Sequence, residues 1–142
     1  MLARRELSEW QVRQRLARKG HQPDVIDDAV GRLLEERAID DTRVAEAIAR
    51  TETAVRKRGK VRVRMQIERA GIAKATATRA ADEVFDGIDD DALLDAALAK
   101  RLRGRDAVAD DREFQRLYRY LVSQGFESDR ALKALNVRKR AR

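Results

Sequence analysis

Three glycines follow apolar residues at the same two spacings, and this recurrence constrains the fold more than any other feature of the sequence. The apolar residues stand eight and four positions before each glycine: Val12 and Leu16 before Gly20, Val63 and Ile67 before Gly71, and Leu117 and Leu121 before Gly125. Residues at i and i+4 share one helix face, and a glycine commonly ends the helix. The glycines lie about 50 residues apart, so the chain of 142 residues is predicted to be a tandem array of helical units.

Each glycine is expected to be followed by a second helix, and the remaining space by a third. Apolar residues recur six and ten positions after the glycines: Ile26 and Val30, Ala77 and Ala81, Ala131 and Leu135. Aspartate pairs, which satisfy free N–H groups at a helix start, precede two further stripes. These are Asp40-Asp41 before Val44, Ala45, Ile48 and Val55, and Asp90-Asp91 before Leu93, Leu94, Ala97, Leu98 and Leu102. The predicted modules are residues 1–38, with two helices and no initial one, then 39–87 and 88–142, each with three.

Local signals fix several of the predicted helix ends. Ser8 and Gln11 have the spacing of a capping box, and Pro23 suits the first turn of a helix. Ser128 suits an N-cap position. The stretch 101–111 contains Gly104 and several charges, and is predicted to be a flexible joint.

The composition favours an all-α protein and argues against an enzyme. The chain has no cysteine and one histidine, His21, which excludes a disulfide, a thiol nucleophile and a zinc site of the Cys or His type. The aspartate pairs are explained by capping, so we expect no metal, no cofactor and no catalytic residue. Aromatic residues make up only 4% and charged residues 40%, which favours exposed helices over a sandwich or barrel. No secretory signal or membrane span is recognisable, so a cytoplasmic protein is expected.

Alanine occupies many of the seam positions, so each unit buries only a thin apolar core. Repeats of this kind contact mainly their neighbours and form elongated, curved arrays. The fold class predicted from the sequence is therefore an elongated, curved, all-α array of tandem three-helix modules, with three repeats, the first lacking its initial helix.

Charge is distributed in blocks, with a formal net charge of +7. A basic block covers residues 56–69 and an acidic block covers 82–95, and the chain ends in a basic tail. Arginine binds phosphate through two parallel hydrogen bonds, so the basic residues are candidates for binding a recombinase or DNA. They are Arg56, Lys57, Arg58, Lys60, Arg62, Arg64 and Arg69, with Arg4, Arg5, Arg13, Arg138, Lys139 and Arg140 as further candidates. The alternative is a solvated face that pairs with the acidic block.

Three aromatic residues are candidates for a binding role. Trp10 lies off the apolar seam of its helix, and either packs on a neighbouring helix or anchors a partner. Tyr118 and Tyr120 are predicted to lie at the edge of the core rather than to stack on bases.

Four segments together resemble the RecX regulatory proteins of bacteria. They are LARRELSEWQVRQRLARKG (2–20), AIDDTRVAEAIAR (38–50), KRGKVRVRMQIERAGI (57–72) and RYLVSQGF (119–126). The resemblance implies tandem three-helix repeats without catalytic residues. It assigns structural positions above all, namely Gly20, Gly71, Gly125, Asp41 and the apolar seam. The sequence departs from the family pattern at two places. Met1 directly precedes Leu2, where relatives carry a further helix, and Val44 stands where the family often has an aromatic residue.

The resemblance also implies a function in DNA repair, recombination and the SOS response. A member of this family binds RecA, or the RecA filament on single-stranded DNA, and inhibits strand exchange, ATP hydrolysis and coprotease activity from the filament groove. The expected partners are thus the RecA recombinase filament and, weakly or indirectly, single-stranded DNA, with the protein itself a monomer.

Two other functions remain open from the residues alone. One is a stand-alone nucleic-acid-binding module, including a helix-turn-helix around residues 61–85. The other is a helical adaptor protein. Binding through phosphates weakens steeply with added salt, whereas an apolar adaptor surface hardly responds.

Overall fold

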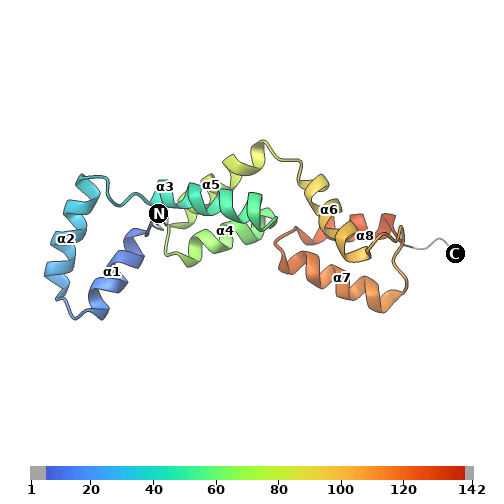
Figure 1. Ribbon diagram of the computed structural model, residues 1–142, viewed down its shortest axis with the longest axis horizontal. Coiled ribbons are helices and arrows are strands. Elements are labelled where there is room, and N and C mark those ends of the chain that lie inside the picture. Colours follow the sequence, from blue (N-terminus) through green and yellow to red (C-terminus); the bar gives the residue numbers. More distant parts are fainter. Residues whose placement is uncertain (1–5, 140–142) are drawn as a thin grey trace.

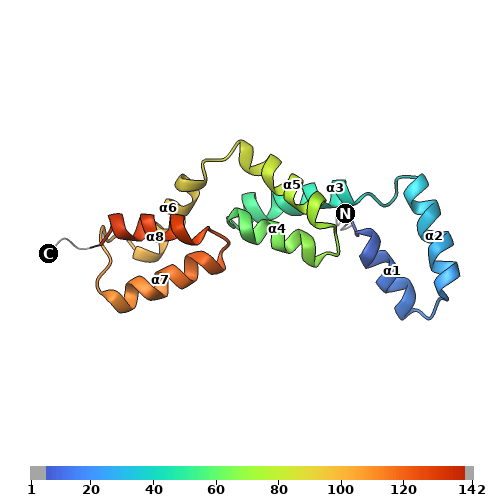
Figure 2. The ribbon, with the colours of Figure 1, turned by 180° about the vertical axis from the view of Figure 1, so that it is seen from behind.

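The computed structural model describes residues 6–139. The regular secondary structure of this part of the chain is helical, apart from one isolated bridge between Val108 and Lys139. The helices are α1 (Glu9–Arg18), α2 (Pro23–Glu35), α3 (Asp41–Arg50), the π-helix η1 (Thr51–Val55), α4 (Lys60–Arg69), α5 (Lys74–Asp86), α6 (Asp90–Leu102), α7 (Asp111–Ser123) and α8 (Ser128–Val137). The molecule is elongated, with α1 and α2 at one end and α6 to α8 at the other (Figure 1). The view from behind shows the same succession of units (Figure 2).

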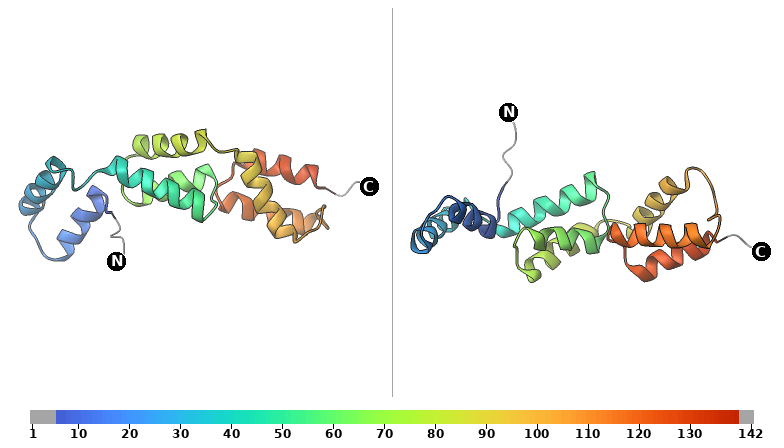
Figure 3. Two further views of the ribbon diagram at one scale, coloured as in Figure 1. Left: turned by 45° about the horizontal axis from the view of Figure 1, so that its top comes forward. Right: turned by 90° about the horizontal axis from the view of Figure 1, so that it is seen from below.

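Three separate apolar cores succeed one another along the long axis. The first contains Ile26, Val30 and Ile39, the second lies among α3, α4 and α5, and the third lies among α6, α7 and α8. Two further views show the three groups of helices following one another along the long axis (Figure 3). The predicted elongated all-α array is confirmed. The boundaries 1–38, 39–87 and 88–142 remain the proposed division.

The helix ends follow the local signals at most positions. Ser8 and Gln11 form the capping box: the Gln11 amide donates to Ser8 Oγ (3.2 Å) and the Ser8 amide donates to Gln11 Oε1 (3.0 Å). Gly20, Gly71 and Gly125 have φ of +90°, +81° and +101°, a region that favours glycine. The prediction for Ser128 is wrong. It is the first residue of α8, and Glu127 precedes it at the cap without a side-chain hydrogen bond.

The second core closes around small side chains. Val44 is buried, and Ala45 and Ala49 of α3 are fully covered beside Ala77 and Ala81 of α5. Small residues on both helices let their backbones approach closely, so a large residue at position 44 is not required here. Val44 thus fills the position where the family often has an aromatic residue and stays buried in this core.

Val55 does not belong to the apolar stripe of α3, contrary to prediction. It is 74% exposed, because the chain changes at Thr51 from α-helix to π-helix. A π-helix has more residues per turn, which rotates the later side chains away from the α-helical seam. Glu52 and Thr53 therefore take the buried positions.

The stretch 101–111 is not a joint between units, since it connects α6 to α7 inside the third unit. Val108 is buried in the third core, and its amide donates to the carbonyl of Arg138 (2.9 Å). Arg105 donates through Nη1 and Nη2 to the two carboxylate oxygens of Glu113 (2.9 and 2.7 Å). These contacts fix a segment that its composition predicted to be flexible.

Candidate functional site

The first and second units meet where the start of α1 lies against the end of α4. The Ser8 hydroxyl, fully buried, donates to the carbonyl of Ala70. The Glu9 amide donates to Asp41 Oδ1 (2.9 Å). Trp10 lies so close to Gly71 that a side chain at position 71 would overlap its Cβ and Cγ. Trp10 thus packs on the neighbouring unit while 48% of its surface stays exposed.

The second and third units meet in the same way, at the start of α4 and the end of α7. The Gly59 amide donates to the carbonyl of Gln124 (2.8 Å), and the Val61 amide donates to the carbonyl of Gly125 (3.0 Å). A side-chain carbon on Gly59 would lie 2.5 Å from the Gly125 carbonyl group. The backbones of these two glycines are therefore in direct contact.

The two contacts place α1, α4 and α7 end to end through the three units (Figure 1). Ser8 and Gly59 stand at equivalent positions, each twelve residues before the glycine that ends its own helix. Each contact satisfies donors that a helix start leaves free and carbonyls that a helix end leaves free. The positive end of one helix dipole also faces the negative end of the next.

Two arginines of the predicted basic block hold the second contact together. Arg58 Nη1 donates to Gln124 Oε1 (2.8 Å), and its Nε lies 3.9 Å from the buried carboxylate of Glu52. Arg62 Nη1 donates to the carbonyl of Ser123 (3.0 Å). These guanidinium groups connect segments more than 60 residues apart, and so they act first as structural groups.

Lys60 pairs with Asp82 (Nζ–Oδ1, 2.5 Å), so one residue of the basic block contacts the acidic block. Arg56 is more loosely placed, 3.9 Å from Glu52 with its side chain 57% exposed. Within residues 6–139, no ion pair involves Lys57, Arg64 or Arg69. Lys57 and Arg69 are exposed and Arg64 is half-buried. These three are the cations of the block most available to a partner.

The further candidates lie apart from this block. Arg13 pairs with Asp27 (2.6 Å) and Glu9 (3.3 Å), and the hydrogen bond to Asp27 raises its pKa above the ordinary value. Arg138 pairs with Asp95 (3.3 Å), and Lys139 lies over the ring of Phe114 at 5.9 Å. Arg4, Arg5 and Arg140 lie outside the described residues.

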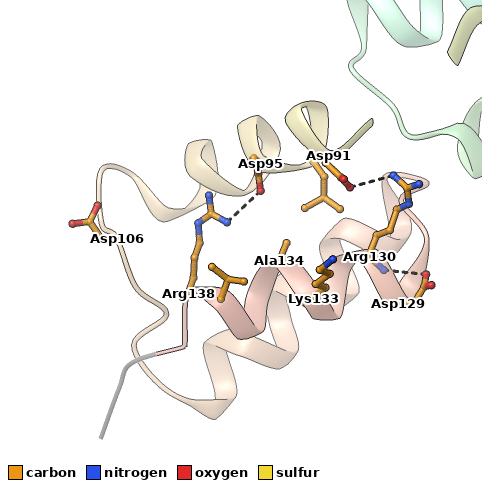
Figure 4. A pocket seen from close by; sticks show the side chains of 10 residues that line it. Asp91, Asp95, Asp106, Asp129, Arg130, Lys133, Ala134 and Arg138 are labelled. Carbon is orange, nitrogen blue, oxygen red and sulfur yellow. Dashed lines mark hydrogen bonds and ion pairs between the residues drawn. The ribbon is translucent and has the colours of Figure 1, made fainter. Parts of the chain in front are cut away.

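A groove of about 740 Å³ separates α6 from α8 in the third unit (Figure 4). Two ion pairs cross it, between Arg130 and Asp91 (3.1 Å) and between Arg138 and Asp95 (3.3 Å). Arg130 also approaches Asp90 (3.5 Å), whose pKa is raised mainly by burial, an effect that Arg130 opposes. Acidic and basic side chains alternate along the groove, so they largely neutralise one another.

One cluster was not singled out by sequence reasoning. A pocket of about 290 Å³ is lined by Arg101 and Arg103 at the end of α6 and by Arg116, Leu117 and Tyr120 of α7. Tyr120 does pack at the edge of the third core, as predicted, but Arg101 Cζ also lies 3.8 Å from the centre of its ring. The available signal was the i, i+4 spacing of Arg116 and Tyr120 beside the basic end of α6. We call this cluster the arginine–tyrosine pocket.

In the part of the chain that the structure describes, no cluster of histidine, cysteine or acidic residues is suited to a metal ion. Nor does any described helix have the length and apolar character to cross a bilayer. The fold defines an elongated helical-repeat protein with exposed cations on its second unit.

Comparison with known proteins places this helical-repeat protein in a family. The model of the domain described as RecX, first three-helix domain, matches residues 1–33. The regulatory protein RecX of Halorhodospira halophila is 34% identical over 130 residues, which are 91% of this chain and 78% of the relative. That of Chromohalobacter salexigens is 32% identical over 95% of this chain and 86% of its own length. The chain belongs to the RecX family of regulatory proteins.

Solved structures show the same fold. A crystal structure of regulatory protein RecX superposes with a TM-score of 0.71 at 18% identity, over 92% of this chain and 64% of that one. RecX from Lactobacillus salivarius superposes with a TM-score of 0.67 at 18% identity, over 92% of this chain and 86% of the other. The tandem three-helix arrangement is thus that of the RecX fold.

Proposed function

We propose that this protein binds RecA, or the RecA filament on single-stranded DNA, and inhibits strand exchange, ATP hydrolysis and coprotease activity. The chain belongs to the RecX family of regulatory proteins, and the resemblance to this family implies RecA as the partner. The observation that carries the proposal is the end-to-end contact of α1, α4 and α7, because it makes one long body from three small units.

Such a body suits a filament better than a small ligand. The elongated array of three units can lie along the groove of a RecA filament and contact successive RecA protomers. A compact domain of the same size would contact fewer of them. Inhibition then needs no chemistry from the protein, since a body in the groove obstructs DNA and coprotease substrates. We place the protein in the cytoplasm, acting as a monomer.

Lys57, Arg64 and Arg69 are proposed to supply the electrostatic attraction, together with Arg56. In the described part of the chain, Lys57, Arg64 and Arg69 have no ion pair, and Arg56 has only a long one to Glu52 (3.9 Å). Arg58, Arg62 and Lys60 are proposed to act indirectly, by holding the surface in place. The further candidates fall into two groups. Three already have internal partners, namely Arg13, Arg138 and Lys139, and three lie outside the described residues, namely Arg4, Arg5 and Arg140.

The test is hydrolysis of ATP by RecA on single-stranded DNA, titrated with this protein at fixed salt. A fall in rate below one protein per RecA protomer is the expected result, because one bound body blocks several protomers. An unchanged rate at saturating protein would contradict the proposal. The same titration at rising salt separates it from an apolar adaptor, whose binding would not weaken.

A further inference from the structure

The arginine–tyrosine pocket has a composition that calls for an anionic ligand. Arg101, Arg103 and Arg116 line it, and no carboxylate belongs to its lining. Within the described part of the chain, Arg101 and Arg103 also take part in no ion pair. Three guanidinium groups held close together repel one another, and a bound anion would relieve that repulsion.

The carboxylate that pairs with Arg116, that of Glu113, is already bound by another residue. Arg105 binds it through two hydrogen bonds (2.9 and 2.7 Å), and the amide of Ala109 adds a third (2.9 Å). Arg116 reaches the same carboxylate only at 3.4 Å, and 66% of its side chain is exposed. Arg105 thus neutralises the acid beside the pocket and leaves Arg116 available to a ligand.

The pocket also presents a flat surface, made by the guanidinium of Arg101 stacked on the ring of Tyr120. The guanidinium of Arg101 lies 3.8 Å from the centre of the Tyr120 ring, the distance of a stacked cation–π pair. Aromatic rings and guanidinium planes are the surfaces on which unpaired bases stack in single-stranded nucleic acid complexes. An acidic peptide would use the charges of the pocket but not this surface.

We infer that the arginine–tyrosine pocket binds one nucleotide unit of a single-stranded nucleic acid, with its phosphate on Arg103 and Arg116 and its base on the Arg101–Tyr120 pair. A volume of about 290 Å³ suits one such unit. Bases within a duplex are already stacked on their neighbours and are not accessible to the pair. The inference concerns direct binding by this chain and needs no recombinase.

The test is the binding of a fluorescent oligothymidine of about 20 nucleotides to the whole protein, without RecA, followed by anisotropy. The double variant Arg103→Gln, Arg116→Gln removes the proposed phosphate contacts. Its control is Arg112→Gln, Arg119→Gln, which removes the same charge from exposed positions of α7 outside the pocket. We expect the pocket variant to bind about tenfold more weakly or worse, and the control to bind within about threefold of the parent protein.

The stacking surface is tested by Tyr120→Leu, which keeps an apolar group at the core edge, and by Tyr120→Phe, which keeps the ring. Leucine is expected to weaken binding about tenfold and phenylalanine to restore it, since stacking needs the ring and not the hydroxyl. Circular dichroism serves as the control that both variants keep their helices.

Several results would overturn the inference. They are equal losses in the pocket and control double variants, a duplex of the same length binding as tightly as the single strand, or binding of thymidine monophosphate without binding of the strand. Failure here is distinct from failure of the proposed function. That function is read from ATP hydrolysis by RecA, and this inference from binding in its absence.

Discussion

Trp10 lies directly on the backbone of Gly71, across the contact between the first two units. Position 71 thus meets two demands at once. Its φ of +81° favours glycine for conformational reasons, and the indole leaves no room for a side chain. The equivalent Gly20 has a similar φ of +90° but no atom close to where a side chain would project. Comparing substitutions at Gly20 and Gly71 therefore separates the effect of backbone conformation from the effect of the contact between units.

Gly71→Ala is therefore expected to destabilise the protein more than Gly20→Ala does. Both place alanine in the left-handed region, at a cost of about 1–2 kcal/mol. Gly71→Ala adds a clash with the rigid base of the Trp10 side chain, for a further ~1–3 kcal/mol. Urea unfolding of both variants measures the difference. Because Trp10 is the only tryptophan, its emission should shift to longer wavelength in Gly71→Ala alone. Equal stability of the two variants would contradict the contact.

Gly59→Ala tests the contact between the second and third units without conformational strain. The φ of Gly59 is −78°, which alanine adopts freely, so any loss comes from overlap with the backbone of Gly125 and Phe126. Backbone atoms cannot move aside as a flexible side chain does, and we expect a loss of ~2 kcal/mol or more.

The control for Gly59→Ala is Gly87→Ala, at φ −97° with no atom within 4 Å. It should change the free energy of unfolding by less than about 1 kcal/mol. Small-angle scattering adds a second measurement, since separated units would broaden the distribution of interatomic distances. A Gly59→Ala protein as stable as the control, with an unchanged scattering profile, would refute the predicted tight approach.

The ion pair between Arg105 and Glu113 predicts a loss of stability in acid. Hydrogen bonds from Arg105 and from the Ala109 amide lower the pKa of Glu113 from 4.5 to about 2. Between these values the unfolded chain binds the proton and the folded chain does not, so stability falls as pH falls through this window. Glu113→Gln should flatten that part of the profile, measured by urea unfolding at pH 7, 4 and 3.

Asp106→Asn, an exposed residue of the same loop, serves as the control and should keep the acid dependence. Asp90 acts in the opposite sense. Its pKa is raised mainly by burial, so protonation of Asp90 favours the folded state. For this reason the difference between the parent protein and Glu113→Gln isolates the Glu113 effect. A Glu113→Gln profile that runs parallel to the parent curve would contradict the assignment.

Helix ends could be predicted from the sequence because their causes are local. The Ser8–Gln11 box, the proline of α2 and the three terminal glycines each depend on residues a few positions apart. Which side chains face the core after Thr51 could not be predicted. The change to a π-helix turns Val55 outward, and no local feature of the sequence signals that change.

The site was less predictable, because charge along a sequence does not distinguish a paired arginine from an available one. Arg58 and Arg62 belong to the same basic block as Arg64, yet their partners Gln124 and Ser123 come from the third unit. Similarly, Arg101 and Tyr120 meet only because α6 and α7 pack together. Contacts between distant segments decide which cations remain for a partner.

The variant Arg64→Gln, Arg69→Gln is expected to weaken inhibition of RecA while leaving stability unchanged. Neither arginine has an ion pair or a side-chain hydrogen bond in the described structure, so replacing them with glutamine breaks no internal polar contact. Two lost charge-assisted contacts should raise the concentration for half-inhibition of ATP hydrolysis by roughly tenfold or more. The salt dependence of inhibition should also become shallower, because fewer phosphates or carboxylates are neutralised.

Two further variants separate this surface effect from general charge and from folding. Lys74→Gln, Arg79→Gln removes the same charge from exposed positions of α5 in the same unit, and should leave half-inhibition nearly unchanged. Arg58→Gln, Arg62→Gln should instead lower the free energy of unfolding by ~1–3 kcal/mol, because the charge-assisted hydrogen bonds to the Gln124 side chain and the Ser123 carbonyl at the contact with α7 are lost. If the α5 variant weakened inhibition as much as Arg64→Gln, Arg69→Gln, net charge rather than the α4 surface would govern binding. If the Arg58 and Arg62 variant were as stable as the parent protein, the structural role assigned to these two residues would be wrong.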